Sequence, residues 1–303
     1  MSHESSLRTD GAGDNDRLPT TTVARTISEL RRSVAEARSR GAALVGLVPT
    51  MGALHEGHLS LIRQADAECA YVVVSIFVNP TQFGPAEDFS RYPRDLERDL
   101  AQAAQAGADV AFVPAAEEMY LPHHSTWVEV EGLTNGLCGA ARPGHFRGVA
   151  TIVAKLLNAC GPDRAYFGQK DAQQLAVIRR MVRDLNMAVD IVACPIVREA
   201  DGLAMSSRNV YLSARERAQA PALRRALIRA EELVEAGERQ AAVLERAMSE
   251  ILAEAETGSV EYVAIVDAVD LQPLGRLTGD CLLALAVRFG TTRLVDNTVV
   301  SAG

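Results

Sequence analysis

The chain carries the stretch ALVGLVPTMGALHEGHL at residues 43–59, and this stretch decides its fold class. The apolar run over 43–48 is typical of a buried strand, and the apolar spacing that starts at Leu59 predicts a helix. Two histidines, His55 and His58, stand where the strand gives way to the helix. Backbone N–H groups and the helix dipole favour an anion at such a junction. The stretch therefore predicts a nucleotide site.

The glycine between the two histidines, Gly57, has no Cβ, so a flat ring can approach the backbone closely there. We therefore expect a base against the chain and phosphates against the imidazoles. Metal ligation is a weaker alternative, because zinc proteases place their two histidines four residues apart on a helix and here the spacing is three. From this segment alone, two solvated histidines at a helix start stay open as a further alternative.

Length and composition limit the classes of protein that the chain can belong to. Its 303 residues suit two domains, and 48% apolar residues provide substantial cores. The formal charge of −8 argues against broad electrostatic binding to nucleic acid or a membrane surface. The longest apolar run is too short for a membrane span, which needs about 18 residues. The five cysteines are dispersed without a Cys-x-x-Cys pair, which indicates reduced thiols in a cytoplasmic protein.

The organisation of the chain is read from alternating patterns. Residues 1–22 are rich in Ser, Gly, Asp and Thr and lack an apolar signal core, so we expect a disordered leader, with an overextended start as the alternative. From residue 23, helices are expected at 27–40, 59–69, 96–106, 148–157 and 172–185, and strands at 43–48, 71–78, 109–113, 164–167 and 189–193. This alternation predicts an α/β fold over 23–196, a doubly wound, Rossmann-like parallel sheet.

The pattern changes near residue 195. Two charged, Ala-rich helices are expected at 214–236 and 241–256, followed by strand-like runs at 260–269 and 281–287. We therefore expect a smaller α+β domain over 197–303, whose charged residues form solvated helix faces.

Two further segments suit phosphate binding. The segment YFGQKDAQQ at 166–174 ends a predicted strand and opens a helix. Ligands of open α/β sheets bind beyond the carboxyl ends of the strands, so Lys170 would meet phosphate oxygens there as a compact positive charge. The segment MSSRN at 205–209 places two hydroxyls and a guanidinium between the domains, as a phosphate clamp would require. An exposed lysine and an ordinary polar hinge are the respective alternatives.

A third segment, FVNPTQFG at 77–84, follows the second predicted strand. Asn79 and Gln82 can offer neutral amides to the hydroxyl and carboxylate groups of a small acid, and the two phenylalanines would supply apolar walls. An ordinary Asn-Pro turn is the alternative. The segment RPGHFRG at 142–148 adds a basic loop.

Five segments together resemble those of the pantothenate synthetases, the pantoate–β-alanine ligase family: 49–58, 77–83, 167–171, 205–209 and 290–297. The resemblance spans residues 26–297 and places the chain in the His-x-Gly-His nucleotidyltransferase superfamily. It implies that ATP and pantoate form pantoyl adenylate and pyrophosphate, and that β-alanine then attacks the adenylate to give pantothenate and AMP. It also implies Mg²⁺, a homodimer, and a C-terminal domain that partly covers the site.

The resemblance assigns roles to single residues. The catalytic set, in contact with the nucleotide and its phosphates, would be His55, His58, Lys170, Ser206, Ser207 and Arg208. The other ATP-binding positions would be Pro49, Thr50, Met51, Gly57, Gly168, Asp171, Val197 and Met205. Pantoate would meet Met51, Gln82 and Gln174. Asn79, Tyr92, Arg142 and His145 would line or cover the pocket, and Asp99 would hold Mg²⁺ indirectly.

One position departs from the family pattern, which often has glutamate where this chain has Gln169. The change is harmless if that side chain faces the surface. Another His-x-Gly-His adenylyltransferase is an alternative function, disfavoured because a phosphorylated acceptor would call for cations in place of Gln82 and Gln174. A non-catalytic ATP sensor is disfavoured because the His55, His58, Lys170 and Arg208 set is complete. The strand at 71–78 and its neighbourhood are candidates for the dimer surface.

Overall fold

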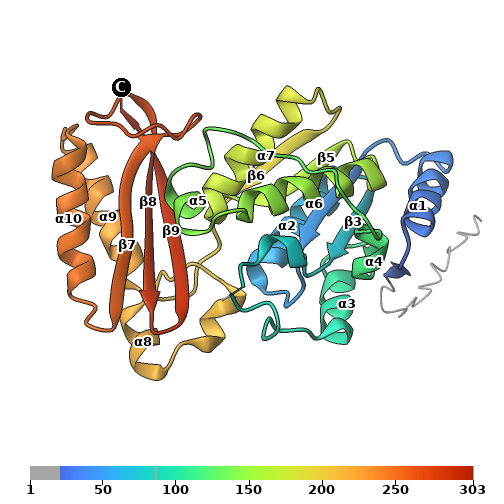
Figure 1. The fold of residues 1–303 in the computed structure, drawn as a ribbon, viewed down its shortest axis with the longest axis horizontal. Helices are drawn as coiled ribbons and strands as arrows, with labels where there is room; N and C mark the ends of the chain where they lie inside the picture. Colours follow the sequence, from blue (N-terminus) through green and yellow to red (C-terminus); the bar gives the residue numbers. More distant parts are fainter. Residues whose placement is uncertain (1–20, 86, 303) are drawn as a thin grey trace, which may run out of the picture.

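The computed structural model describes residues 21–85 and 87–302. Two parts lie side by side, one built on a six-stranded sheet and the other on a three-stranded sheet (Figure 1). The leader predicted over 1–22 falls almost entirely outside the described residues. Its last residue, Thr22, already begins a strand, β1 (Thr22–Ala24), which the sequence did not predict. This short strand pairs with β4 at the edge of the larger sheet.

The larger sheet is entirely parallel, which confirms the predicted doubly wound fold. Its other strands are β2 (Val45–Thr50), β3 (Tyr71–Ile76), β4 (Val110–Phe112), β5 (Arg164–Gly168) and β6 (Asp190–Cys194), in the order β1-β4-β3-β2-β5-β6. The chain runs outward from β2 through β3 to β4 and later resumes at β5, on the other side of β2. Ligands of such sheets bind where the strand order reverses, beyond the carboxyl ends of β2 and β5.

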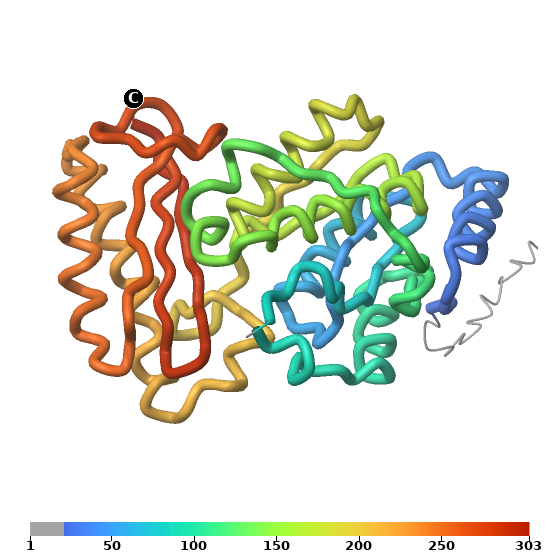
Figure 2. Tube along the Cα trace, viewed as in Figure 1, coloured from blue at the N-terminus to red at the C-terminus, as the bar shows by residue number. Residues whose placement is uncertain are grey.

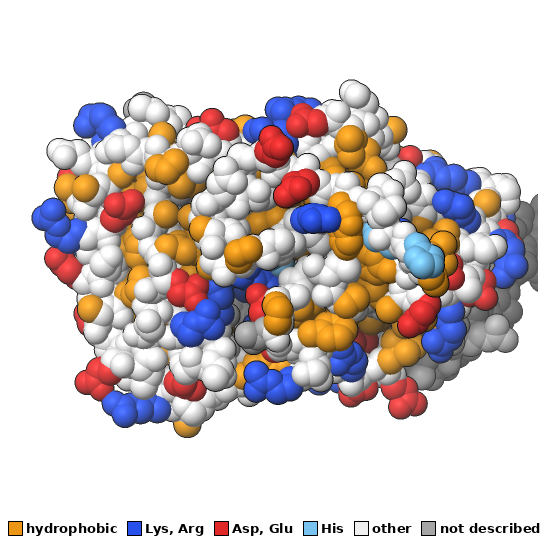
Figure 3. All heavy atoms as spheres, viewed as in Figure 1, with side chains coloured by type: hydrophobic (Ala, Val, Ile, Leu, Met, Phe, Trp, Pro, Cys, Tyr) orange, Lys and Arg blue, Asp and Glu red, His pale blue; other side chains and the backbone are white. Residues whose placement is uncertain are grey.

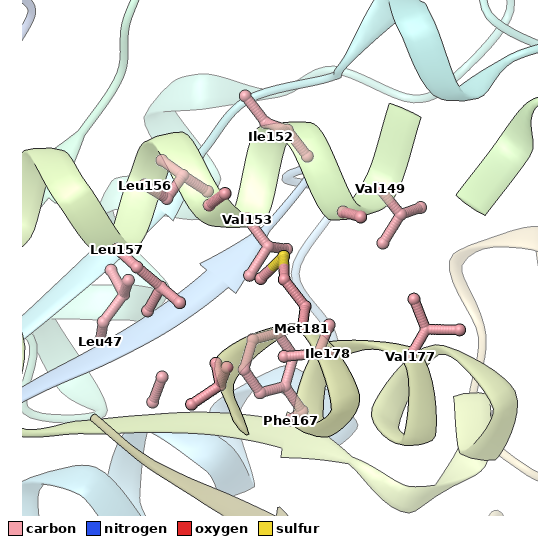
Figure 4. Packing of buried hydrophobic residues seen from close by; sticks show 14 of the residues in the cluster. Leu47, Val149, Ile152, Val153, Leu156, Leu157, Phe167, Val177, Ile178 and Met181 are labelled. Carbon is pink, nitrogen blue, oxygen red and sulfur yellow. The ribbon is translucent and has the colours of Figure 1, made fainter. Parts of the chain in front are cut away.

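Helices cover both faces of this sheet. On one face lie α1 (Ile27–Ser39), α6 (His145–Cys160) and α7 (Ala172–Asp184), and on the other α2 (Glu56–Glu68) and α3 (Leu96–Gln105). Strand side chains alternate between the two cores, so Val73 packs with the first group while Val72 and Val74 pack with the second. Figure 4 shows side chains of α6 and α7 meeting Leu47 and Phe167 of the sheet.

The C-terminal part differs from its prediction in two places. Its elements are α8 (Ala214–Gln219), α9 (Ala222–Glu235), α10 (Ala241–Ala253), β7 (Gly258–Asp267), β8 (Gly279–Phe289) and β9 (Thr292–Ala302), with the strands antiparallel in the order β7-β8-β9. The single helix predicted over 214–236 is two helices, because Pro221 has no N–H and cannot continue a helix. Strand β9 was missed because Thr292, Arg293, Asp296 and Asn297 interrupt its apolar pattern.

Both faces of the smaller sheet are packed. In β8, Leu283 and Leu285 belong to the core formed with α9 and α10, whereas Leu282 and Ala284 belong to the core that includes α6 and α7. The short helix α5 (Leu137–Ala141) lies beside β9, as Figure 2 shows, and Arg293 Nη1 is 3.3 Å from Cys138 Sγ. The division near residue 197 stays a prediction. What the packing provides is a seam along which residues of both parts face each other.

The position of strand β3 in the sheet bears on the expected dimer surface. Strand β3 runs between β2 and β4, and its residues from Val72 to Ile76 are buried, so this strand itself offers no dimer surface; its neighbourhood stays a prediction. Among the described residues, no helix combines the length and the apolar character needed to cross a membrane.

Candidate active site

A cavity of about 1100 Å³ lies between the two parts of the molecule. Its walls come from the segment after β3, from α5 and the start of α6, from the turn after β5, from the connection before α8, and from β9. Acidic and basic side chains stand next to each other along the boundary of the two parts in Figure 3. The cavity therefore includes the segment after β5, one of the two strands at the point where the strand order reverses.

The structure brings many of the predicted residues together at this cavity. Eight of them form its wall: Gln82, Arg142, His145, Lys170, Asp171, Gln174, Ser206 and Arg208. Three others are close to wall residues. Met51 Sδ is 3.0 Å from Gln82 Nε2, and the Tyr92 hydroxyl is 3.2 Å from the Oγ of Ser207, which stands between Ser206 and Arg208 in the chain. Predicted residues outside the wall in this structure are Pro49, Thr50, His55, Gly57, His58, Asn79, Asp99, Gly168, Val197 and Met205. For all of them the roles toward substrate stay predictions.

The two histidines meet at the start of α2. His55 is the N-cap residue, and its Nδ1 accepts the backbone N–H of Gly57 at 3.1 Å. Because Nδ1 accepts, the neutral ring carries its proton on Nε2. The ring of His58 lies 4.1 Å from that of His55, centre to centre. A Cβ on Gly57 would come within 2.9 Å of His55 Cε1, so the ring that needs this glycine is the His55 imidazole itself.

Both imidazoles are neutral at pH 7. Burial, together with the Lys170 charge, lowers the pKa of His55 from 6.5 to about 4. Burial, followed by the influence of His55 and Lys170, holds the pKa of His58 well below its usual range. Within the described chain, His58 Nδ1 is buried without a hydrogen-bond partner. The pair therefore presents neutral hydrogen-bonding groups, with Lys170 as the cation.

The loop that carries Met51 is held by a buried carboxylate. Asp99, on α3, is 2% exposed, and its two oxygens accept the backbone N–H groups of Ala53 and Leu54, each at 2.8 Å. Gly52 has a positive φ of 78°, and a Cβ there would lie 2.8 Å from Asp99 Oδ2. The sequence predicted Asp99 as an indirect Mg²⁺ ligand, but its contacts in the structure are those of a loop anchor.

Asn79 supports Gln82 from below the cavity wall. It is 1% exposed and caps the 3₁₀ turn η1 (Pro80–Gln82), and its Nδ2 donates to Gln82 Oε1 at 3.1 Å and to the carbonyl of Gly148 at 3.2 Å. The Tyr120 hydroxyl donates to Asn79 Oδ1 at 2.8 Å. These bonds use the amide that the sequence assigned to the pocket, so in this structure Asn79 positions Gln82.

Arg142 and His145 form one hydrogen-bond network with Gln82 and Glu87, in the segment that follows β3. Arg142 donates to both Glu87 oxygens at 2.6 Å and to His145 Nε2 at 2.9 Å. Since arginine can only donate, His145 Nε2 accepts and its Nδ1–H donates to the Gln82 carbonyl at 2.8 Å. Burial and the Arg142 charge lower the pKa of His145 to about 4. His145 is thus a neutral bridge between Arg142 and the backbone of Gln82.

Arg208 is also paired with an acidic residue that the sequence analysis did not single out. Arg208 belongs to the 3₁₀ turn η3 (Ser207–Tyr211). Ser206 caps this turn, since its side chain accepts the backbone N–H of Arg208 at 3.2 Å. The Arg208 guanidinium donates to both oxygens of Asp88 at 3.0 and 2.9 Å. Glu87 and Asp88 are adjacent and follow the segment 77–84. This pair of acids was the signal in the sequence that could have indicated partners for the two arginines.

Comparison with known proteins follows the same motifs. The model of the Pantoate-beta-alanine ligase family matches residues 22–299. The chain belongs to the pantoate–β-alanine ligase family. Pantothenate synthetase of Moorella thermoacetica is 61% identical over 276 residues, which cover 91% of this chain and 97% of that protein. The enzyme of Heliobacterium modesticaldum is 59% identical over 278 residues, covering 91% and 99%.

Solved structures of the family share the fold. Pantothenate synthetase from Thermus thermophilus matches with a TM-score of 0.87 at 49% identity, over 92% of this chain and 99% of that one. The pantoate–β-alanine ligase of Francisella tularensis, solved with beta-gamma ATP and beta-alanine, matches with a TM-score of 0.74 at 31% identity, over 92% and 98%. The resemblance noted in the sequence is confirmed, and the chain is a ligase that joins pantoate and β-alanine through a carbon–nitrogen bond.

Proposed function

We propose that the cavity holds ATP and pantoate together and that the ligation proceeds through pantoyl adenylate. The observation that carries this proposal is the convergence of Lys170, Arg208 and the amides of Gln82 and Gln174 on one cavity. Cations suit the phosphates of ATP, and neutral amides suit the hydroxyl and carboxylate groups of pantoate. The solved Francisella tularensis relative, with its bound ATP compound and beta-alanine, supports the same substrates for this chain.

In the first step the pantoate carboxylate attacks the α-phosphorus of ATP, a carboxylate-to-phosphorus bond forms, and pyrophosphate leaves. The carboxylate is itself the nucleophile, so the protein's task is alignment and charge stabilisation. Lys170, Ser206, Ser207 and Arg208 would stabilise the phosphates. His55 would donate its Nε2–H as a neutral group, since its Nδ1 is engaged with Gly57. Hydrogen bonds to charged groups contribute about 1.5–3 kcal/mol each.

In the second step the free amine of β-alanine attacks the adenylate carbonyl, the amide bond forms, AMP leaves, and the amine loses one proton to solvent. A base within the protein would need an unengaged lone pair near neutral pH. His145 does not meet this requirement, because its Nε2 accepts from Arg142 and its pKa is about 4. Within the described residues, His58 has an unpartnered Nδ1, but burial holds its pKa well below its usual range, so it is a weak base. We therefore propose that β-alanine enters already as the free amine.

Magnesium, a homodimer and a cytoplasmic location are parts of the same proposal. Within residues 21–85 and 87–302, no group of three or more His, Cys, Asp or Glu side chains could hold a metal, and Asp99 is engaged by the loop. Mg²⁺ often binds through substrate phosphates and water, so it would enter with ATP. Family membership supports the homodimer. The five free cysteines fit a reducing compartment.

The test of the proposal is pantoate-dependent exchange of labelled pyrophosphate into ATP, with β-alanine absent and Mg²⁺ supplied. Exchange that requires pantoate would establish the acyl adenylate as a separable intermediate. Pantothenate formation without exchange would retain the ligase activity and refute the separable intermediate. Exchange driven only by a phosphorylated acceptor would favour the alternative adenylyltransferase, and ATP binding without turnover of any acid would favour the sensor.

A further inference from the structure

Strand β9 carries two buried polar residues to which the proposed chemistry assigns no role. Asp296 and Asn297 are 2% and 4% exposed, and both lie in the wall of the cavity. They belong to the segment 290–297, which is part of the resemblance to the ligase family. Burial of two adjacent polar side chains is costly unless each finds partners. The partners that they find lead to the two phosphate-binding segments.

Asn297 holds the turn that carries Lys170. Its Nδ2 donates to the backbone carbonyls of Gln169 and Lys170, at 3.1 and 2.8 Å. Both carbonyls belong to the 3₁₀ turn η2 (Gln169–Asp171). A turn this short has few internal hydrogen bonds, so an external donor that bridges two of its carbonyls restricts its orientation. Asn297 therefore restricts the orientation of the turn from which the Lys170 side chain projects.

Asp296 holds the segment that leads to Ser206. Its two oxygens accept from Arg198 Nη1 at 2.6 Å and Nη2 at 2.9 Å. Arg198 Nη1 also donates to the Gly202 carbonyl at 3.0 Å, and Arg198 forms an antiparallel bridge with Ala204. The Met205 N–H donates to the Val197 carbonyl at 3.0 Å. A small hairpin over 197–205 is thus anchored on β9 immediately before Ser206.

The two anchors stand on one rigid support. Strand β9 is paired with β8 from Thr292 to Ala302, and Asp296 and Asn297 are consecutive residues within that ladder. The lysine turn comes from the larger part of the molecule, and the Ser206–Arg208 turn comes from the connection between the parts. The distance between the lysine turn and the Ser206–Arg208 turn therefore depends on the support that both share, strand β9.

We infer that Asp296 and Asn297 are a positioning pair, through which the C-terminal sheet sets the distance between Lys170 and the Ser206–Arg208 turn. Neither residue is assigned a contact with the substrate; Asn297 acts through the Lys170 turn and Asp296 acts through Arg198. The assignment of phosphates to Lys170 and Arg208 rests on the proposed function. If the role of Asn297 were purely structural, its substitution would lower stability, and its effect on ATP binding would be the same with or without Lys170.

The test is a double-mutant cycle read by the ATP dissociation constant of the full chain, measured by calorimetry. We expect Asn297→Ala to weaken ATP binding about tenfold, as loss of one charged contact would. In the Lys170→Ala background the same substitution should change the affinity by less than about twofold, because its effect passes through Lys170. Equal losses in both backgrounds, or no loss in the parent, would overturn the inference.

Matched variants keep the result interpretable. Asn297→Asp preserves the size but cannot donate, so it should weaken ATP binding at least as much as Asn297→Ala. Thr298→Val, one residue further along β9, should leave the affinity unchanged. If Asn297 variants do not fold, the cycle of Arg198→Lys with Arg208→Ala tests the other anchor by the same criterion. A parent chain that folds but binds no ATP would refute the proposed function and the inference together, whereas normal binding with additive losses would refute the inference alone.

Discussion

The guanidinium of Arg208 is paired with both carboxylate oxygens of Asp88, at 3.0 and 2.9 Å. Although burial alone would raise it, the hydrogen bond from Arg208 holds the pKa of Asp88 below its usual range. The partner of the proposed phosphate ligand is therefore a carboxylate at neutral pH. A phosphate that binds the same edge of the Arg208 guanidinium would have to replace this carboxylate, and a substrate at Arg142 would compete with Glu87 in the same way.

The first prediction concerns this exchange. Asp88→Asn removes the competing charge, so ATP should bind about two- to fivefold more tightly, which corresponds to about 0.4–1 kcal/mol, the upper part of the usual range for exposed ion pairs. Glu97→Gln, an exposed change on α3 that removes the same charge, is the control. ATP dissociation constants of both variants should be compared with the parent. An Asp88→Asn value no tighter than that of Glu97→Gln would contradict the competition.

The second prediction concerns Lys170. Lys170→Ala should lose about a hundredfold or more in pyrophosphate exchange, because a charge-assisted contact in the transition state is worth about 3 kcal/mol or more. Its melting temperature should stay close to that of the parent, since Lys170 is only half-buried. Lys155→Ala, at the other lysine of the chain, should retain exchange. Near-normal exchange in Lys170→Ala would remove Lys170 from the proposed site.

The third prediction separates the two chemical steps. His58→Ala should slow adenylate formation more than amide formation. The reason is that the triphosphate, which His58 is expected to contact, is present in the first step and has lost pyrophosphate before the second. Single-turnover rates with ATP and pantoate, and with preformed adenylate and β-alanine, measure the steps separately. A larger defect in the amine step would show that the histidine pair serves the second reaction instead.

The fourth prediction concerns Asp99. Asp99→Asn keeps one acceptor but turns an NH₂ group toward a backbone N–H, so the loop at Ala53 and Leu54 loses one bond and gains a repulsive contact. The free energy of unfolding should fall by about 1.5–3 kcal/mol, the usual range for a hydrogen bond to a charged group. Urea unfolding at pH 7 measures it. Unchanged stability accompanied by a loss of Mg²⁺ dependence would instead support the metal role predicted from the sequence.

The fifth prediction concerns acid stability. The pKa of His145 is about 4 in the folded chain and 6.5 in the reference state, so the unfolded state binds more protons between these values. Stability should be complete above about pH 6.5 and fall as the pH is lowered toward 4, and His55, with the same direction of shift, should add to the loss. His145→Asn cannot ionise, so its unfolding free energy should depend less steeply on pH in this window. An unchanged slope would show that the ring is not buried as a neutral group.

The prediction of the fold succeeded where the pattern is local. The strand and helix around residues 43–69 and the parallel alternation through β6 follow from apolar spacing over short windows. Strand β9 was not predicted, because its buried polar residues are paired with Arg198 and the Lys170 turn, which lie far from β9 in the sequence. Pro221 was a readable signal, and the helix over 214–236 was predicted without giving it weight.

The site shows the same division. The segments around His55, Gln82, Lys170 and Arg208 identified the chemistry, because residue type and order alone carry the resemblance to the ligase family. The partners of those segments were not readable, since Asp99 lies 45 residues from Leu54 and Asn297 lies 127 residues from Lys170.

Local sequence therefore carried the identity of the elements and of the reacting groups. Tertiary packing alone decided that the histidines are neutral, that Arg208 is paired with Asp88, and that β9 anchors the lysine turn. The physical reason is that desolvation and hydrogen bonding depend on distances of a few ångströms between segments far apart in the chain. Those distances exist only once the two sheets have packed against each other.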